Sequence, residues 1–143
     1  MTQHSQARTS GGFTLIEVMI TVAIVAILAS IAYPSYLRYI IRSNRSAAQG
    51  YMLEVTNLQQ RYLLDARAYA ANLATLNSSV PSHVSSNYTV TTAPKTGTTL
   101  PGFRVTATPI GSQLARDTDC AELTIDESGT KTASGNSGVA GCW

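Results

Sequence analysis

Hydrophobic and polar positions are sharply segregated along the 143 residues of this chain. Between residues 18 and 33, fourteen of sixteen residues are apolar and none is charged. Extending the run back to residue 13 gives 21 residues with a single charge, Glu17. Because about 20 apolar residues in a helix span the hydrocarbon core of a bilayer, the pattern predicts one membrane-compatible helix near the N-terminus.

The helical pattern continues beyond Pro34, where apolar and small residues recur at steps of three and four along one stripe. Its members are Leu37, Ile40, Ile41, Ala47, Ala48, Tyr51, Val55, Leu58, Tyr62 and Ala66. This period is typical of an amphipathic helix. Since it resumes directly after the proline, we expect Pro34 to kink the helix and not to end it. Residues 36–70 are therefore predicted to be an amphipathic continuation of the first helix.

Residues 71–143 have a different pattern, in which short alternating runs are separated by turns that contain Gly and Pro. The runs cover residues 88–91, 103–107, 121–125 and 130–133. Alternation of this kind predicts a small antiparallel sheet of three or four strands in a globular head. One face of the sheet should pack on the helix stripe around residues 51–62, because no other element is long enough to cover it. The predicted fold class is α+β, a long N-terminal helix packed on this sheet.

Composition leaves three interpretations of the N-terminal apolar run: a secretory signal peptide, a plain membrane anchor, or a helix that is kept after a polar leader is removed. A signal peptide has an apolar core of 7–15 residues followed by a small-residue cleavage site. The run in this chain is longer, and the Ile-Ala-Tyr-Pro at residues 31–34 is a poor site of that kind. The residues just before the run favour the third interpretation.

Positions 11–17 read Gly-Gly-Phe-Thr-Leu-Ile-Glu, and an apolar helix follows. This junction resembles the class III signal of type IV pilins and pseudopilins. The resemblance implies that a membrane-embedded prepilin peptidase cuts between Gly12 and Phe13 and methylates the new N-terminal Phe13. Residues 1–12 would then be a cleaved leader and residues 13–35 the transmembrane and filament-core helix. The implied location is the bacterial inner membrane, with a single span and a periplasmic head, and then an extracellular pilus.

Glu17 is the one charge inside the apolar helix. An unpaired carboxylate deep in a membrane costs about 2–3 kcal/mol or more. One interpretation is that Glu17 reaches the headgroups on the cytoplasmic side. The resemblance implies another, in which Glu17 of an incoming subunit meets the α-ammonium of Phe13 in a neighbouring subunit and sets the register of assembly.

Charge along the second half of the helix is positive, with five Arg against Glu54 and Asp65 over residues 36–70. Arg38, Arg42 and Arg45 share one helix face. We expect this face to be solvated, or to contact headgroups or an acidic surface of a neighbour, and Arg61 to pair with Asp65. By the positive-inside rule the arginines would place the C-terminal side in the cytoplasm. The leader and the cysteines argue for a C-terminus outside the cytoplasm.

Cys120 and Cys142 are the only cysteines, and no other ligand lies near them in sequence for a zinc site. In an exported chain a disulfide is the expected state, and closing a loop of this length is worth about 3 kcal/mol. The C-terminal sequence also resembles minor pilins of the PilE type, in which a cysteine pair closes a loop exposed on the filament. His83 is the only imidazole beyond the leader, so a multi-His metal site is excluded.

The leading interpretation is therefore a structural subunit of a type IV pilus, minor and not major. Its expected partners are other pilin subunits through the N-terminal helix, the prepilin peptidase and the pilus assembly machinery. No phosphate-binding loop, metal motif or nucleophile constellation is present, so we expect no catalytic residues, no metal and no cofactor.

Two alternatives remain: a competence pilin that binds DNA, and a type II secretion pseudopilin. For the first, residues 71–143 carry four Lys and Arg against five Asp and Glu, a net charge of −1 that has the wrong sign for phosphates. For the second, Asp117, Asp119 and Asp126 are conceivable calcium ligands, although loop and turn aspartates are the simpler interpretation.

Overall fold

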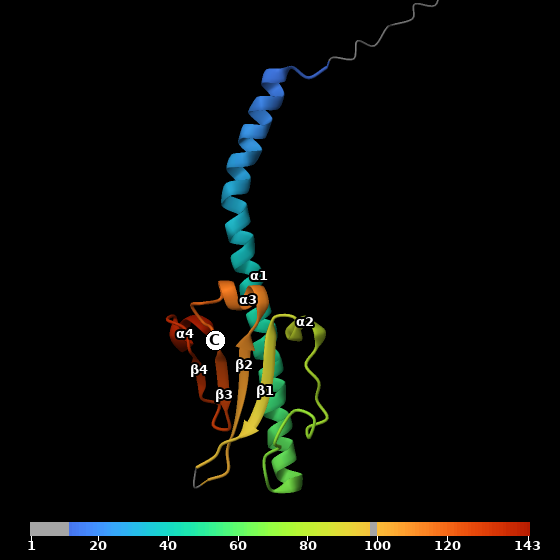
Figure 1. Ribbon diagram of the computed structural model, residues 1–143, viewed down its shortest axis with the longest axis vertical. Helices are drawn as coiled ribbons and strands as arrows, with labels where there is room; N and C mark the ends of the chain where they lie inside the picture. The colour runs from blue at the N-terminus through green and yellow to red at the C-terminus, as the bar shows by residue number, and fades with distance from the viewer. Residues whose placement is uncertain (1–11, 98–99) are drawn as a thin grey trace, which may run out of the picture. The chain divides into compact units, whose positions relative to one another are not determined.

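The computed structural model describes residues 12–97 and 100–143. The helices of this part of the chain are α1 (Leu15–Ala66), α2 (Ser82–Ser85), α3 (Gly111–Arg116) and α4 (Gly138–Cys142). The strands are β1 (Tyr88–Pro94), β2 (Phe103–Pro109), β3 (Leu123–Asp126) and β4 (Lys131–Ala133) (Figure 1). The chain divides into two units, Met1–Arg38 and Tyr39–Trp143, and each is described by itself.

Helix α1 begins at a local capping motif. The backbone N–H of Glu17 donates to the Thr14 hydroxyl at 3.3 Å, as in the Ser/Thr-x-x-Glu pattern that satisfies free N–H groups at a helix start. The helix continues past Pro34, as its sequence period predicts. It ends at Ala66, four residues before the predicted boundary, because Arg67 adopts a left-handed conformation with φ of 54° that stops the helical repeat.

The four strands form one antiparallel sheet in the order β1-β2-β3-β4. Residues alternate between a buried and a more exposed face, most regularly in β1 and β2. The register brings Thr91 of β1 opposite Thr106 of β2, which lies opposite Thr124 of β3, which in turn lies opposite Thr132 of β4. A row of four threonines therefore crosses the open face of the sheet.

The core lies between the other face of the sheet and the second part of α1. The helix contributes a stripe of buried side chains and the sheet contributes the alternate residues of its strands. The main members are Ala48, Tyr51, Met52, Val55, Val90, Phe103, Val105, Leu123 and Ile125. This packing confirms the predicted α+β class, with the sheet against the predicted helix stripe.

A buried glutamine attaches the segment after α1 to the core. Gln59 is fully buried, and its amide group donates to the Ala70 carbonyl at 3.0 Å and to the Thr92 hydroxyl at 2.9 Å. Its carbonyl oxygen accepts from the Ala70 N–H at 2.8 Å. These bonds fold the chain back after Ala66 and bring Ala70 into the interior, where a helical continuation would not place it.

The C-terminal segment is held by a covalent bond and by its last side chain. Cys120 and Cys142 form a disulfide with Cα atoms 5.5 Å apart. The indole N–H of Trp143 donates to the Thr132 carbonyl at 2.9 Å, and the Lys131 ammonium lies 4.9 Å from the Trp143 ring centroid. The terminal residue is therefore fixed against β4.

Candidate functional site

The N-terminal residues named by the sequence analysis lie close together. Phe13 is 82% exposed, and Phe13 and Glu17 line one hollow of about 310 Å³ with Val18 and Thr21. Gly12 and Phe13, which flank the expected cleavage site, are both described. Residues 1–11 of the expected leader lie outside the described residues.

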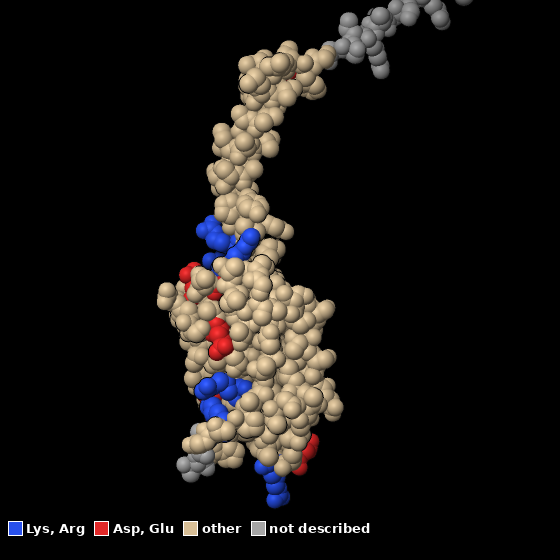
Figure 2. Space-filling view, viewed as in Figure 1, with Lys and Arg blue, Asp and Glu red and all other residues tan. Residues whose placement is uncertain are grey.

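The first part of α1 is apolar, and its side chains are exposed. Its large side chains are exposed, from Leu15 at 78% to Ile31 at 69%, and the helix contains a window long and apolar enough to cross a membrane. Figure 2 shows an almost uncharged surface over this stretch in the view drawn. Such a surface is stable only in lipid or against other apolar helices.

A buried polar cluster connects the second part of α1 to α3 and β1. The Arg45 guanidinium forms a salt bridge with Asp117, with Nε 3.1 Å from Oδ2, and the Tyr88 hydroxyl donates to the same oxygen at 2.8 Å. The Gln113 amide nitrogen lies 3.0 Å from Asp117 Oδ2 and 3.1 Å from the Ile41 carbonyl. We call these residues the Asp117 cluster.

The environment of the Asp117 cluster shifts two pKa values upward. Burial, and next the hydrogen bond to Asp117, raise the pKa of Tyr88, so its hydroxyl stays a donor. Burial alone would lower the pKa of Arg45, but its hydrogen bond and attraction to Asp117 raise it. The sequence interpretation placed Arg45 on a face that meets solvent, headgroups or a neighbour; its partner is in fact Asp117 of the same chain.

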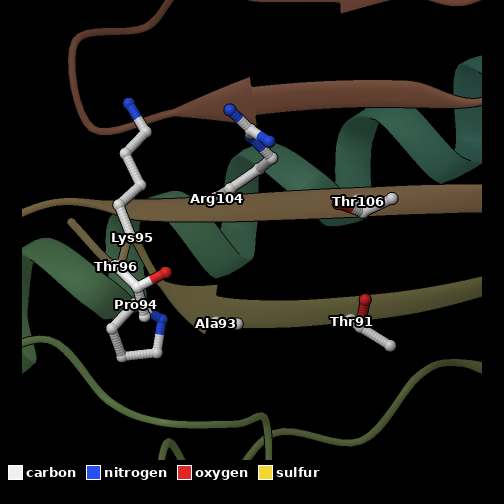
Figure 3. A pocket seen from close by; sticks show the side chains of 7 residues that line it. All are labelled: Thr91, Ala93, Pro94, Lys95, Thr96, Arg104 and Thr106. Atoms are coloured by element: carbon white, nitrogen blue, oxygen red, sulfur yellow. The ribbon is translucent and has the colours of Figure 1, made fainter. Parts of the chain in front are cut away.

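The open face of the sheet has a shallow hollow at its β1–β2 end. The hollow has a volume of about 340 Å³ and is lined by Thr91, Ala93, Pro94, Lys95, Thr96, Arg104 and Thr106. Figure 3 shows that the side chains of Lys95, just after β1, and of Arg104 in β2 extend in the same direction. We call this the threonine hollow, because three of its seven lining residues are threonines.

Lys95 is held by two carboxylates from the turn between β3 and β4. Its ammonium lies 3.0 Å from Asp126 Oδ2 and 2.9 Å from Glu127 Oε2. These hydrogen bonds, with that to Glu127 the larger, raise the pKa of Lys95. Burial would raise the pKa of Asp126, but bonds from Ser128, Lys95 and the Thr130 backbone outweigh it and lower that pKa to about 2.

Glu127 belongs to the same group. Burial would raise its pKa, but the hydrogen bond from Lys95 outweighs this and lowers it. Glu127 Oε2 also accepts from the Phe103 N–H at 3.3 Å. The turn between β3 and β4 is thus attached to the base of the loop between β1 and β2.

One other expected contact, between Arg61 and Asp65, differs from the structure. Among the residues described, the salt bridges join Arg45 to Asp117 and Lys95 to Asp126 and Glu127, and none joins Arg61 to Asp65. The conceivable calcium ligands do not converge, because Asp117 and Asp126 bind these separate cations. Within residues 12–97 and 100–143, no three His, Cys, Asp or Glu side chains are grouped to hold a metal ion.

The fold is that of a type IV pilin. A type IV pilin from Shewanella oneidensis superposes with a TM-score of 0.52 over 72% of this chain and 97% of that one, at 22% sequence identity. The type IV wide pilus major component PilA4 of Thermus thermophilus is 38% identical over 69 residues, 48% of this chain and 53% of that protein. A type IV major fimbrial protein FimA of Dichelobacter nodosus is 46% identical over 56 residues, 39% and 36% of the two chains. The chain spans about half or less of the length of these curated relatives.

The assignment to a family does not rest on the apolar helix alone. The sequence profile of the family described as "Type IV minor pilin ComP, DNA uptake sequence receptor" matches residues 34–124, which include the second part of α1, strands β1 and β2, and the start of β3. The profile of the prokaryotic N-terminal methylation motif matches residues 7–33. The chain belongs to this family of type IV minor pilins.

Membership of the family settles the general role of the chain. It is a structural, non-enzymatic pilus subunit, made as a prepilin whose apolar N-terminal helix places it in the inner membrane before it enters the pilus. The predicted type IV pilin and its disulfide are confirmed.

The net charge that bears on DNA is that of the whole sheet-bearing unit. The unit from Tyr39 to Trp143 carries eight Lys and Arg against seven Asp and Glu, a net charge of +1. Three of its acidic groups, Asp117, Asp126 and Glu127, are already paired with cations inside the fold. Residues 71–143 alone have a net charge of −1, and residues 39–70, which include Arg45, the partner of Asp117, bring the net charge of the unit to +1.

Proposed function

We propose that this chain is a minor subunit of a type IV pilus that binds duplex DNA outside the cell with its sheet-bearing unit. The observation that carries the proposal is the profile match over residues 34–124, because it covers strands β1 and β2 and the helix part that packs on the sheet, beyond the apolar N-terminal run. The threonine hollow supports it, since hydroxyl and guanidinium donors are the groups that contact phosphates. The net charge of this unit also has the sign that DNA requires.

The test uses the full processed chain in non-ionic detergent micelles and dye-labelled duplex DNA. We expect fluorescence anisotropy to show binding that weakens steeply with salt, and selection from a random duplex library to enrich one recurring short sequence. Binding without any enriched sequence would reduce the proposal to nonspecific DNA contact. Absence of salt-dependent binding would remove it.

We propose further that the prepilin peptidase cuts between Gly12 and Phe13 and methylates Phe13. The methylation-motif match over residues 7–33 supports this position. Intact mass of the protein from membranes should report residues 13–143 with one added methyl group and one disulfide. Gly12→Leu should retain the leader, and a mature N-terminus at Phe13 in that variant would contradict the assigned site.

We also propose that Glu17 sets the register of assembly by pairing with the Phe13 α-ammonium of a neighbouring subunit, and that Pro34 kinks α1. Glu17→Ala would remove not only the charge but also a side chain of the type that completes a capping box, although the bond from the backbone N–H of residue 17 to Thr14 would remain. Glu17→Gln keeps a side chain that can complete a capping box but removes the charge. We expect Glu17→Gln to be processed and inserted normally yet to be poorly incorporated into filaments. Normal incorporation would exclude the charge pair.

A further inference from the structure

Two cationic side chains, Lys95 and Arg104, line the threonine hollow, and they differ in how free they are to bind a ligand. Lys95 is bound by both Asp126 and Glu127, and its side chain is 20% exposed. Arg104 is exposed, and among the residues that the structure describes its guanidinium forms no hydrogen bond or ion pair. The charge of Lys95 is therefore largely neutralised by its two partners, whereas the charge of Arg104 is available to a ligand. Both side chains line the same hollow.

The sheet register explains why Arg104 is left free. Its neighbour on β3 is Asp126, which would be the natural partner of an arginine on the same face. Asp126 is already in use, because Oδ1 accepts from Ser128 and from the Thr130 N–H while Oδ2 accepts from Lys95. The turn thus binds the lysine and leaves the arginine as a charged donor without a partner in the described chain.

Two hydroxyl groups next to Arg104 are also available. Thr91 and Thr106 face each other across β1 and β2, and in the described part of the chain neither hydroxyl has a hydrogen-bond partner. The next two members of the same row differ, since the Thr124 and Thr132 hydroxyls bond to each other at 2.6 Å. β-Branched side chains lose little rotamer freedom on binding, because their χ1 is already restricted in a strand.

We propose that a phosphodiester backbone of duplex DNA lies in the threonine hollow, where Arg104 is its charged contact and Thr91 and Thr106 are its neutral donors. Lys95 is a positioning residue, which Asp126 and Glu127 hold away from the DNA. This assignment rests on the proposed DNA-binding function and adds which cation carries it. Guanidinium suits a phosphate because it offers parallel donors in a fixed plane.

The salt dependence of binding separates the two cations. Each phosphate neutralised by a cation contributes about 0.9 to the slope of log K against log salt concentration. Arg104→Gln should lower that slope by about 0.9 and weaken binding about tenfold or more at low salt. Lys95→Gln combined with Asp126→Asn removes the lysine together with the carboxylate that could otherwise pair with Arg104. This double variant should leave the slope unchanged, while its thermal unfolding shifts to a lower temperature because the β3–β4 turn loses its attachment.

The full chain in non-ionic micelles is titrated with labelled duplex at several KCl concentrations between about 50 and 200 mM. Arg116→Gln is the matched control, since Arg116 is an exposed arginine of α3 in the same unit and the substitution changes the net charge equally. We expect Arg116→Gln to have the wild-type slope. Thr91→Val with Thr106→Val should weaken binding without changing the slope, because no charge is removed.

A third charge variant tests the role of the carboxylates. Glu127→Gln removes one of the two groups that hold Lys95, so binding should tighten and the slope should steepen. An Arg104→Gln slope equal to that of Arg116→Gln would overturn the assignment of the cations. So would a loss of slope in the Lys95→Gln, Asp126→Asn double variant equal to that in Arg104→Gln. If the wild-type chain itself shows no salt-dependent binding, the proposed DNA-binding function is wrong.

Discussion

The two parts of α1 differ in how much of their apolar surface is buried. In the unit from Tyr39 to Trp143, Met52 and Val55 of the helix are fully buried against the sheet. In the first part of the helix, side chains of the same kind, such as Ile27 at 63% and Leu28 at 62%, remain exposed. Exposed apolar surface costs about 25 cal/mol per Å² in water. The sheet-bearing unit therefore supplies its own core, whereas the apolar helix depends on lipid or on neighbouring subunits.

The strongest test of this difference truncates one buried apolar side chain of the sheet-bearing unit and one exposed apolar side chain of the first part of α1. Phe103 is fully buried and its ring lies 4.8 Å from that of Tyr69. Phe103→Ala should lower the free energy of unfolding of the sheet-bearing unit by about 3–5 kcal/mol, since it removes a ring and leaves a cavity. Urea unfolding in non-ionic micelles, followed by near-UV circular dichroism, measures this loss.

The matched variant is Ile27→Ala in the exposed part of α1. It should leave the same urea midpoint unchanged, and its effect should appear in filament assembly. A shift as large as that of Phe103→Ala would mean that the apolar helix contributes to the stability of the sheet-bearing unit, and the contrast would fail.

Removal of the disulfide should have the next largest effect on the sheet-bearing unit. Cys120→Ser with Cys142→Ser should lower the free energy of unfolding by about 3 kcal/mol, because the open loop regains entropy in the unfolded chain. The same urea experiment measures it, and the reduced wild-type protein is a second route to the same state. Unchanged stability in both would show that the core alone holds α4 and the C-terminal segment.

Breaking the salt bridge of the Asp117 cluster should have the next largest effect on stability. Arg45→Met leaves the buried Asp117 carboxylate without its cation and should cost about 2–3 kcal/mol of unfolding free energy. Arg42→Met is the control, since Arg42 lies on the same helix and is exposed. Equal effects of the two variants in urea unfolding would show that the salt bridge is not what stabilises the cluster.

The smallest expected effect is a dependence on pH. Because the pKa of Asp126 is about 2 in the folded protein and 3.8 ordinarily, its contribution to stability is present above about pH 4 and is lost as the pH falls towards 2. The Tm of the wild-type chain should fall over this range more steeply than that of Asp126→Asn. Identical slopes would exclude Asp126 as a source of the acid sensitivity.

Sequence periodicity was enough to predict the long helix, its buried stripe and the antiparallel strands, since each depends on residues close together in the chain. The Thr14-to-Glu17 capping pattern was equally local and could have been found in the same way. Helices α3 and α4 have six and five residues, too few to show a period, and both begin at a glycine.

The contacts that define the candidate sites could not be predicted, because they join distant residues. Arg45 meets Asp117 across 72 positions, and Lys95 meets Asp126 across 31. No local pattern distinguishes these arginine and lysine residues from solvated ones. Gln59 illustrates the same point. A polar residue on a helix is expected to be exposed, but Gln59 is fully buried, and its amide is satisfied by hydrogen bonds to Ala70 and Thr92.

The fixed position of Trp143 has a practical consequence for imaging filaments. A reporter sequence disturbs a fold least in a segment with few contacts. The Trp143 indole is bonded to Thr132 and lies against Lys131, so a reporter placed next to Trp143 would disturb these contacts. The segment around Ser79, between α1 and α2, is no better a place, because Ser78 is hydrogen-bonded to Tyr51 and Val80 packs against the core.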